Sequence, residues 1–472
     1  MTVSTPLDLS EPTDVHLIAI GGAGMAAIAE LLHGMGHRVR GSDMHASASI
    51  DHLRSLGIDA IVGHDASNVV IADDAASGAL AKIAAKSTAV PESNVEVQEL
   101  ERHGVSVRHR GDVLAAIAAL KKTAAVAGTH GKTTTTSMLA VICSHAETDP
   151  SYIIGGVVPD LGSGARWGGG EWFVLEADES DGSGFGLGHE VGIVTNVERD
   201  HLEFYGDEAN MVEAFRGFVD ASPVAIVCAD DPGAAALAGG SNVVTYGTVE
   251  SATYRMDNIE RGSSSITFDL VRADELLGTI RVPMPGKHNA LNAAAATAAA
   301  LEMGISFEAA RSALSTFGGV GRRFDARGEA GGVTFVDDYA HLPTEVRAAL
   351  AAGVDADHDR LVAVFQPHRY SRTETVWEEF EGAFDDADLL VLTDIYPSGE
   401  APRPGITGEL IVEAAKRSSG HPEIIYHADR ESLPRALAEI LQPGDLCLTL
   451  GAGDLVKIPD QVQPLLLTED RA

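Results

Sequence analysis

The segment 127–137, AGTHGKTTTTS, restricts the fold of this chain more than any other stretch. It follows the apolar run 123–128, TAAVAG, and opens a helical pattern over 132–145. A strand that runs through glycines into a helix is the phosphate-binding turn of α/β proteins, so the pattern predicts a parallel sheet covered by helices. The usual spacing would place a glycine at position 126, where this chain has Val126.

The shorter loop still contains every chemical part of a phosphate site. Such a site needs glycines that let N–H groups converge, a helix whose first amides are unpaired, a lysine, and a hydroxyl for magnesium. Gly128, Gly131, Lys132 and Thr133 supply these parts. We therefore expect the loop to bind a nucleotide triphosphate; a glycine-rich turn that happens to carry a lysine is the alternative.

A second glycine loop, 21–30, GGAGMAAIAE, lies between another predicted strand and helix. Gly22, Gly24 and Ala27 match G-x-G-x-x-A, and Asp43 follows about 20 residues later, as in dinucleotide sites. Because the helix N-terminus recognises a pyrophosphate and not a nicotinamide, any nucleotide diphosphate would fit. A purely structural tight turn remains the other interpretation.

The order of strand and helix patterns predicts three α/β domains, consistent with the chain length of 472 residues. Residues 1–118 should form a Rossmann-like domain, and 119–320 a central P-loop ATPase-like domain in which 242–285 form a small antiparallel sheet. Residues 321–472 should form a second Rossmann-like domain.

The charge balance excludes several classes of partner. With 69 acidic and 34 basic residues the formal charge is −35, which repels nucleic acid and anionic lipid. The N-terminal residues lack a secretion pattern, and no apolar run approaches the length of a membrane span. Cys143, Cys228 and Cys447 lie in apolar contexts that favour reduced core thiols, so we expect a cytoplasmic protein that binds neither nucleic acid nor membranes.

Acidic residues gather where two predicted strands end. The run 176–182, EADESDG, brings Glu176, Asp178, Glu179 and Asp181 to a strand's carboxyl end, and Asp200 and His201 follow the next strand. Carboxylates crowded at one sheet edge are costly without a cation, so magnesium is expected there. A lone histidine is usually structural, yet beside this cluster His201 is a candidate ligand.

The last third of the chain concentrates arginines in an otherwise acidic protein: Arg322, Arg323, Arg369 and Arg372. They are candidate clamps for carboxylate or phosphate groups, with structural salt bridges as an equally open alternative. We find no G-x-S-x-G motif and no cysteine beside a plausible base. The chemistry expected is therefore direct phosphoryl transfer.

Taken in order, these motifs identify a family. The segments GGAGMAAIAE, GTHGKTTTTS, EADESDG, TNVERDHLEFYG, PGKHNALNAAAA, RRFD, DDYAHLPTE and FQPHRYSRT resemble the Mur ligases of peptidoglycan synthesis, from about residue 15 to residue 455. The resemblance implies ATP-dependent joining of L-alanine to the lactyl carboxylate of UDP-N-acetylmuramate through an acyl phosphate. ATP and Mg²⁺ are the implied cofactors, and the third domain is expected to close over the other two.

The resemblance also implies roles for individual residues. Lys132, Glu176, His201, Arg323, Asp338 and His341 would be catalytic, and Thr133, Glu176 and His201 would hold magnesium. ATP would contact Gly128, Thr129, His130, Gly131, Lys132, Thr133, Thr134, His288, Asn289, Asn292, Arg323 and Asp338. The sugar nucleotide and the amino acid would contact Gly22, Gly24, Met25, Ser42, Asp43, Ser180, Asp181, Tyr339, His341, Arg369 and Arg372.

Three departures from the family pattern matter. No lysine occurs between His201 and Lys287, which agrees with the alanine-adding branch, because most later-acting ligases carry a modified lysine there. Leu342 follows His341 where the family usually has a second histidine. Gly184 separates Ser183 from Phe185 where the family usually has S-D-x-S-F, which leaves the geometry of that loop open.

Other functions are still compatible with these motifs. A recycling ligase that attaches an intact tripeptide to the same sugar nucleotide shares most of them, although it usually has tyrosine where this chain has Ser180. A nucleotide-sensing ATPase would leave the clustered arginines of the third segment unexplained. A nicotinamide dehydrogenase rests on the first glycine loop and Asp43 alone. The sequence is compatible with a monomer or a homodimer.

Overall fold

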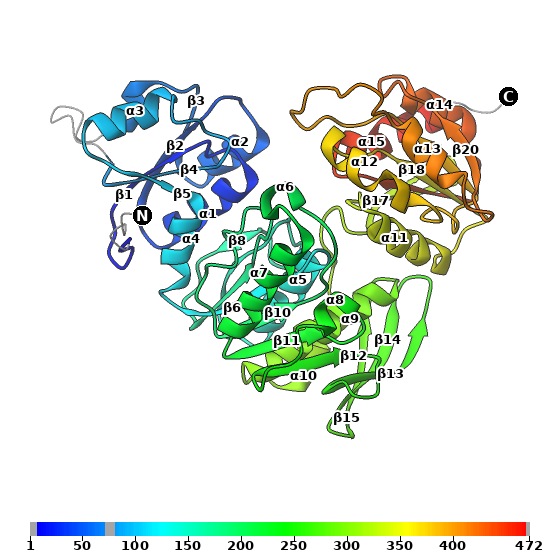
Figure 1. Ribbon diagram of the computed structural model, residues 1–472, viewed down its shortest axis with the longest axis horizontal. Helices are drawn as coiled ribbons and strands as arrows, with labels where there is room; N and C mark the ends of the chain where they lie inside the picture. Colours follow the sequence, from blue (N-terminus) through cyan, green and yellow to red (C-terminus); the bar gives the residue numbers. More distant parts are fainter. Residues whose placement is uncertain (1–6, 71–80, 469–472) are drawn as a thin grey trace. The chain divides into compact units, whose positions relative to one another are not determined.

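The computed structural model describes residues 7–70 and 81–468. Three separate sheets follow one another along the chain (Figure 1), with five, ten and six strands. Each sheet is built mostly from parallel strands with helical connections, so the prediction of a three-domain α/β protein is confirmed. The divisions expected after residues 118 and 320 stay predictions. No helix within the described part of the chain is both long and apolar enough to cross a membrane.

The chain also divides into two compact units. The first contains Met1–Met256, Leu270–Leu277 and Asn292–Ala313, and the second contains Asp257–Asp269, Gly278–Leu291 and Leu314–Ala472. Both glycine loops and the acidic run lie in the first unit, whereas the arginine-rich motifs lie in the second.

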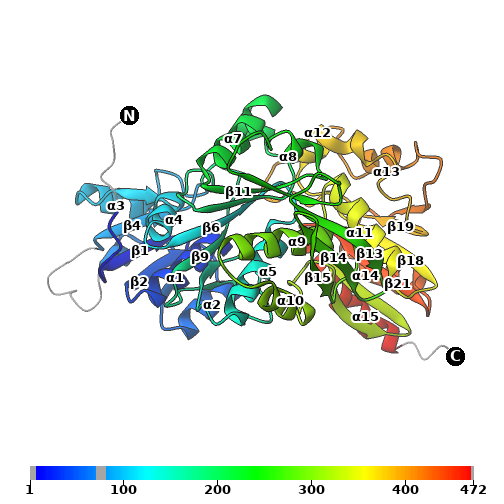
Figure 2. The same ribbon diagram turned by 90° about the horizontal axis from the view of Figure 1, so that it is seen from below.

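The first sheet has the strand order β3-β2-β1-β4-β5, all parallel. Right-handed crossovers in this order place α1 and α2 on one face and α3 on the other, as Figure 2 shows. The elements are β1 (Asp14–Ile18), α1 (Ala23–Gly34), β2 (Arg38–Asp43), α2 (Ala48–Ser55), β3 (Asp59–Val62), η1 (Ala66–Val69), β4 (Ile83–Lys86), α3 (Val95–Arg102), β5 (Val107–His109) and α4 (Arg110–Ala118).

The second sheet contains the phosphate-loop strand, β6, as an interior strand. Its order is β15-β14-β13-β12-β11-β10-β6-β9-β7-β8, so β6 lies between β9 and β10. Its strands are β6 (Lys122–Ala127), β7 (Ser151–Ile153), β8 (Ala165–Arg166), β9 (Trp172–Glu176), β10 (Val191–Val194), β11 (Val224–Cys228), β12 (Val243–Gly247), β13 (Tyr254–Arg261), β14 (Ile266–Arg272) and β15 (Glu275–Val282). The associated helices are α5 (Lys132–His145), α6 (Leu202–Tyr205), α7 (Glu208–Ala221), α8 (Pro232–Ala235), α9 (Lys287–Glu302) and α10 (Phe307–Ser315).

The expectation of an antiparallel sheet over residues 242–285 is only partly confirmed. β12 pairs in parallel with both β11 and β13, so this strand belongs to the parallel part of the sheet. The direction of β12 is set by the helical crossover that precedes it. The alternation of apolar residues along the strand does not reveal this direction. From β13 to β15 the connections are too short for a parallel crossover, so these neighbouring strands form hairpins.

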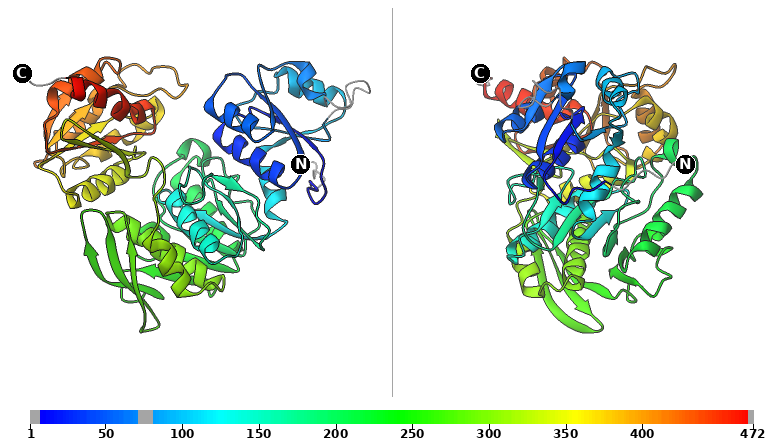
Figure 3. Two further views of the ribbon diagram at one scale, coloured as in Figure 1. Left: turned by 180° about the vertical axis from the view of Figure 1, so that it is seen from behind. Right: turned by 90° about the vertical axis from the view of Figure 1, so that its left-hand side faces the viewer.

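The third sheet, drawn from yellow to red in Figure 3, has the order β16-β17-β21-β18-β19-β20. Alternate residues of β18 enter two different cores: Leu361, Ala363 and Phe365 pack with α11 and α13, whereas Val362 and Val364 pack with α14 and α15. Its elements are β16 (Asp325–Ala330), β17 (Val333–Asp338), α11 (Pro343–Asp355), β18 (Arg360–Phe365), α12 (Tyr370–Val376), η3 (Trp377–Phe380), β19 (Leu389–Leu392), α13 (Glu409–Ala415), β20 (Glu423–Tyr426), α14 (Leu433–Ile440), β21 (Asp445–Leu450), η4 (Asp454–Lys457) and α15 (Ile458–Thr468).

Candidate active site

The phosphate loop has the backbone that its glycines permit. Gly128 and Gly131 adopt φ values of +138° and +77°, and Gly131 is the N-cap of α5 without any side-chain cap. A Cβ atom on Gly128 would lie 2.0 Å from Thr195 Oγ1, and one on Gly131 would lie 2.5 Å from Asn292 Oδ1. Neither position accepts a side chain. The first amides of α5 therefore stay uncovered by the protein's own side chains, as an anion site requires.

Two residues that the sequence did not single out brace this loop. Thr195 Oγ1 donates to the carbonyl of His130 at 2.6 Å, and Asn196 Oδ1 accepts from the His130 amide at 2.7 Å. Asn196 Nδ2 donates to the same carbonyl at 3.0 Å. Both residues directly follow β10, the parallel neighbour of β6, so pairing of these strands positions the brace. Both lie in the motif TNVERDH, in which only Asp200 and His201 are predicted site residues from the sequence.

Lys132 is fully engaged within the loop. Its Nζ donates to the carbonyls of Gly128 at 2.6 Å and Thr129 at 3.1 Å, and to Glu179 Oε1 at 2.8 Å. Burial alone would lower the pKa of Lys132, but the nearby charge of Glu179 outweighs it and holds that pKa above the usual range. The lysine is thus a permanent cation whose three donors are already used, and a phosphate must take the place of at least one acceptor.

Glu179 is the least satisfied carboxylate of the acidic run. The residue is only 5% exposed, and its Oε2 has no hydrogen-bond partner. Burial raises the pKa of Glu179, although the charge of Lys132 opposes this. Sequence reasoning placed Glu179 in the acidic cluster without a role; the structure makes it the counter-ion of the loop lysine.

Thr133 and Glu176 come together as expected for a magnesium site. Thr133 Oγ1 donates to Glu176 Oε1 at 3.2 Å, and Glu176 Oε2 accepts from the Gly155 amide at 2.9 Å. No group of three or more His, Cys, Asp or Glu residues in the described ranges could hold a metal by itself. Mg²⁺ can bind through one or two protein oxygens together with waters and nucleotide phosphates, so the role predicted for Thr133 and Glu176 does not require such a group.

His201 follows β10 on the same edge, in a conformation uncommon for a non-glycine residue. It adopts φ +54° as the N-cap of α6, and its Nε2 lies 3.3 Å from Asp200 Oδ2. Arg322 and Arg369, both predicted site residues of the second unit, also have positive φ values, of +63° and +69°. Unusual backbone at several predicted positions is typical of functional sites.

The remaining predicted ATP contacts near α5 and α9 are buried. Thr134 lies in the first turn of α5 and is 4% exposed, and Asn292 Oδ1 accepts from Thr135 Oγ1 at 3.3 Å. Asn289 Nδ2 donates to the Pro285 carbonyl at 2.7 Å, so this amide fixes the turn before α9. Asn292 lies in the first unit and Asn289 in the second.

The first glycine loop is stabilised from within by Asp43. Gly22 caps α1 without a side-chain bond, and Asp43 Oδ2 accepts from the Gly21 amide at 3.0 Å. Met25 is buried, so only its backbone could meet a ligand. Ser42, expected to contact substrate, is fully buried and donates to Glu96 Oε2 at 2.6 Å. The side chain of Ser42 therefore holds the strand in place, because it alternates with Asp43 toward the opposite face of the sheet.

A cavity of about 710 Å³ connects the first glycine loop to the acidic run. Ala23, Gly24 and Ala27 line one side, and Glu176, Asp178 and Gly184 line the other. Arg110 lies between them, with Nη2 3.0 Å from Asp178 Oδ2 and 2.9 Å from Asp181 Oδ2. The structure thus brings two predicted sites, separated by about 150 residues of sequence, to one hollow.

Two of the three departures from the family pattern have simple structural consequences. A Cβ on Gly184 would lie 2.4 Å from the backbone nitrogen of Asp178, so glycine allows the acidic run to fold back on itself. Ser180 donates its amide to Asp178 Oδ1 at 3.0 Å within the same turn. Leu342 is 5% exposed and joins the core under α11, so the missing second histidine is replaced by a packing residue.

In the second unit, Asp338 ends β17 and is held by backbone amides. Its Oδ2 accepts from Phe324 N at 2.7 Å and its Oδ1 from Ala340 N at 2.8 Å. Burial raises the pKa of Asp338 to about 6, although the charge of Arg323 opposes the rise. His288 is also close to Arg323, and burial together with that charge lowers the pKa of His288 to about 4. His288 is therefore neutral at physiological pH.

Aromatic rings and arginines form the rest of this cluster. Arg322 and Arg323 lie over the ring of Tyr339, with guanidinium carbons 4.8 and 5.0 Å from its centroid. His341 packs edge-on against His368, with ring centroids 5.8 Å apart, and Arg372 Nη1 lies 3.1 Å from His368 Nδ1. Burial, reinforced by the charges of neighbouring basic groups, lowers the pKa of His368 to about 3.

Arg369 and His368 complete this cluster. Arg369 Nε is buried without a partner. His368 is not among the site residues predicted from the sequence, although it stands in the motif QPHRYSRT next to Arg369 and four residues before Arg372. Because His368 is buried, neutral and in contact with predicted substrate residues, it is a candidate site residue.

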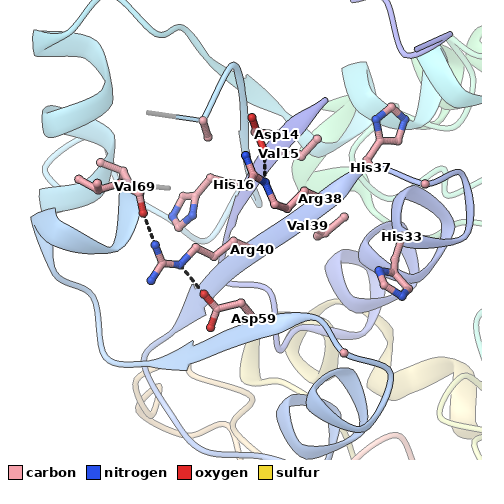
Figure 4. A pocket seen from close by; sticks show the side chains of 14 residues that line it. Asp14, Val15, His16, His33, His37, Arg38, Val39, Arg40, Asp59 and Val69 are labelled. Carbon is pink, nitrogen blue, oxygen red and sulfur yellow. Dashed lines mark hydrogen bonds and ion pairs between the residues drawn. The ribbon is translucent and has the colours of Figure 1, made fainter. Parts of the chain in front are cut away.

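A second cavity, of about 400 Å³, lies outside these sites (Figure 4). Asp14, Arg38 and Asp59, which line it, begin β1, β2 and β3, so it lies at the amino ends of the strands. Its arginines are already paired: Arg38 with Asp14, and Arg40 with Asp59 at 2.7 Å. Ligands of open parallel sheets bind at the carboxyl ends, so this cavity is separate from the candidate active site.

Comparison with known proteins agrees with this arrangement. Three family models match in order: "Mur ligase family, catalytic domain" over residues 14–122, "Mur ligase middle domain" over 126–300, and "Mur ligase, glutamate ligase domain" over 322–453. A UDP-N-acetylmuramate–L-alanine ligase of Anaeromyxobacter sp. is 44% identical over 462 residues, covering 97% of this chain and 98% of the relative. The ligase of that name from Geobacter sulfurreducens is 43% identical, covering 93% of this chain and 95% of its own.

Solved structures give the same result at the level of the fold. The UDP-N-acetylmuramate-alanine ligase of Thermotoga maritima matches with a TM-score of 0.78 and 28% identity, covering 95% of this chain and 98% of that one. A murein peptide ligase of Psychrobacter arcticus matches with a TM-score of 0.69 and 22% identity, covering 97% of this chain and 99% of that one. At this identity the match supports the fold alone.

Proposed function

This chain belongs to the Mur ligase family, and on that premise we propose that it joins L-alanine to the lactyl carboxylate of UDP-N-acetylmuramate with cleavage of ATP. The product is a precursor of peptidoglycan. One observation carries the proposal from the family to this chain: the phosphate loop with Lys132, Thr133 and Glu176 opens beside a cavity shared with the first glycine loop. A phosphoryl donor and a nucleotide-linked acceptor can therefore be bound at neighbouring positions.

The first step transfers the γ-phosphoryl group of ATP to the lactyl carboxylate. A carboxylate oxygen attacks phosphorus, the bond to the β-phosphate oxygen breaks, and ADP leaves. Lys132 neutralises the transferring group once it exchanges a loop acceptor for phosphate oxygen. Mg²⁺, when bound by Thr133, Glu176 and His201, supplies charge stabilisation for the phosphate oxygens. The uncapped amides of α5 hold those oxygens without moving.

The second step makes the amide bond. The neutral amine of L-alanine attacks the acyl-phosphate carbon and a tetrahedral intermediate forms. Its C–O bond to phosphate then breaks, and inorganic phosphate departs with the proton that the nitrogen loses. We assign His341, Tyr339, Arg369 and Arg372 to the sugar and amino-acid side, and Arg323, Asp338 and His288 to the nucleotide. The neutral state of His288 favours hydrogen bonding over charge in that role.

The decisive experiment measures phosphate release from ATP with UDP-N-acetylmuramate, with and without L-alanine. Release that requires both substrates, together with formation of the alanyl product, supports the ligase. Replacing L-alanine by the intact tripeptide tests the recycling alternative, and the same assay with L-serine and glycine measures selectivity. Phosphate release that ignores both substrates would favour a nucleotide-dependent switch instead.

Location and assembly belong to the same proposal. Since UDP-linked sugars and ATP are cytoplasmic metabolites, we place the enzyme in the cytoplasm, without a membrane or nucleic-acid partner. The formal charge of −35 supports the exclusion of polyanions. A monomer or a homodimer is expected, and sedimentation at several protein concentrations distinguishes the two.

A further inference from the structure

We propose that Arg110 exchanges partners during the reaction cycle: it holds Asp178 and Asp181 in the free protein and the diphosphate of the sugar nucleotide in the complex. The inference rests on the proposed function and adds to it a binding residue and a link between two substrate sites. Sequence reasoning assigned no role to Arg110.

Arg110 lies directly beside the first glycine loop. It is the first residue of α4, its side chain is 24% exposed, and it lines the large cavity. A Cβ on Gly24 would lie 2.8 Å from Arg110 Nη1, so the guanidinium rests against the backbone of the loop. The absence of a side chain at Gly24 is what allows this approach.

The guanidinium is only partly used. Both ion pairs, to Asp178 at 3.0 Å and to Asp181 at 2.9 Å, use the same nitrogen, Nη2. The Nε atom is buried without a hydrogen-bond partner. Arginine carries five N–H donors in a planar fork that matches the spacing of phosphate oxygens. Because both ion pairs use one nitrogen and Arg110 lines the cavity, its guanidinium has N–H donors left for an anion.

The surroundings favour a diphosphate. The N-terminus of α1 has no acidic residue in its first turn and no side-chain cap, so its amides attract an anion. The cavity wall beside these amides includes Ala23, Gly24 and Ala27, which are small enough for phosphate to reach the backbone. Carboxylates of Glu30, Glu176 and Asp178 also line the cavity, so an anion there needs a cationic partner. Among the described residues that line the cavity, Arg110 is the only lysine or arginine. It is therefore the available counter-ion for the anion.

Partner exchange links this site to the phosphate loop. Ser180 and Ser183 donate their amides to Asp178 at 3.0 Å and Asp181 at 3.1 Å, so both carboxylates keep partners after Arg110 leaves. The same run contains Glu179, the partner of Lys132. Binding of the sugar nucleotide therefore changes the charge balance beside the lysine that must receive ATP, which couples the two binding events.

The test uses calorimetric titration without ATP, so it does not depend on turnover. Arg110→Gln should weaken binding of UDP and of UDP-N-acetylmuramate by about tenfold to a hundredfold, the range for losing hydrogen bonds to a charged group. Arg110→Lys, which keeps the charge, should recover part of the loss. Arg102→Gln is the matched control, because Arg102 is an exposed arginine paired with Glu99. Thermal melting verifies that each variant is folded.

A double-mutant cycle separates partner exchange from simple repulsion. Asp181→Asn should tighten UDP binding several-fold in the parent protein, because it removes a competitor for Arg110, and should lose this effect in the Arg110→Gln background. Equal tightening in both backgrounds would mean that Asp181 only repels the phosphates. Unchanged UDP affinity in Arg110→Gln would also overturn the proposal.

Further ligands separate the possible failures. UDP lacks the lactyl carboxylate, so a loss confined to UDP-N-acetylmuramate would assign Arg110 to the carboxylate and overturn the diphosphate assignment. A parent protein that ligates L-alanine while Arg110→Gln binds UDP normally would leave the ligase function intact and reject only the exchange. A parent protein that binds no UDP sugar would reject both.

Discussion

Lys132 Nζ lies 2.8 Å from Glu179 Oε1, and this ion pair is almost entirely shielded from water, with side chains 14% and 7% exposed. In the free protein the loop lysine is therefore neutralised by a carboxylate of the same unit. A bound phosphate must displace Glu179 or share Lys132 with it. Leaving either buried charge without a partner would cost several kcal/mol of free energy, about 3–5.

The first prediction concerns Lys132 itself. Lys132→Ala should lower kcat for phosphate release by about 10²–10³-fold, because it removes a fixed charge from the transferring phosphoryl group. Lys122→Ala is the control, since Lys122 is a half-exposed surface lysine paired with Glu171 at the start of the same strand. Full turnover of the Lys132 variant would remove the loop from the reaction.

The second prediction concerns the backbone of the loop. Gly128→Ala should abolish binding of a non-hydrolysable ATP analogue, because the new Cβ would lie 2.0 Å from Thr195 Oγ1 at a φ of +138°. Gly217→Ala is the control: Gly217 lies within α7 with open space around it, so the change should stabilise the fold by up to about 1 kcal/mol. Fluorescence titration and melting curves of the two variants make the comparison.

A third prediction addresses magnesium. Thr133→Val removes a hydroxyl that lies 3.2 Å from Glu176 while keeping the shape of the side chain. The Mg²⁺ concentration for half-maximal phosphate release should rise about tenfold or more. Thr253→Val is the control, because Thr253 is an exposed residue in the connection between β12 and β13. This change should leave the Mg²⁺ titration unchanged. An unaltered Mg²⁺ requirement in the Thr133 variant would exclude this hydroxyl from the metal site.

The fourth prediction follows from Glu96 in the first sheet. Burial alone would raise its pKa, but hydrogen bonds from His16, Ser42 and Asn68 lower the pKa from 4.5 to about 2. The folded form thus holds the carboxylate ionised more strongly than the unfolded chain. The resulting stability is present above pH 4.5 and is lost as the pH falls toward 2, by up to about 3 kcal/mol.

Glu96→Gln should therefore lower the melting temperature at pH 7 and reduce its acid dependence. Glu92→Gln, a change at an exposed carboxylate nearby, is the control. Melting curves from pH 3 to 7 give the comparison, and equal acid dependence in the two variants would contradict the assignment.

The fifth prediction has the opposite sign. Burial raises the pKa of Asp338 from 3.8 to about 6, so the folded protein binds this proton more tightly than the unfolded chain. The contribution to stability is complete below pH 3.8 and is lost as the pH rises through about 6. Asp338→Asn should remove this slope.

Asparagine cannot accept with one oxygen from both amides that Asp338 binds, so the absolute stability of this variant also falls by about 1 kcal/mol. The decisive quantity is therefore how the difference in stability between the variant and the parent protein changes with pH. Melting curves between pH 4 and 8 measure it. Asp357→Asn, at an exposed position, serves as the control.

The sequence determined the architecture and the nature of the chemistry. Glycines before Lys132, acidic residues after β9 and alternating strand and helix patterns are local signals, because backbone conformation and side-chain periodicity act over a few residues. They predicted three α/β domains and an edge where Thr133 meets Glu176. They failed for β12, whose direction depends on a crossover and not on its own residues.

Only the tertiary structure decided which side chains face one another. Arg110 is separated from Asp181 by 71 residues, and Thr195 from His130 by 65, so no local pattern links either pair. Ser42 lies next to Asp43 in sequence, yet the first is buried against Glu96 and the second supports the glycine loop. Strand pairing brings distant residues together and turns adjacent ones apart, and this placement is a property of the folded chain as a whole.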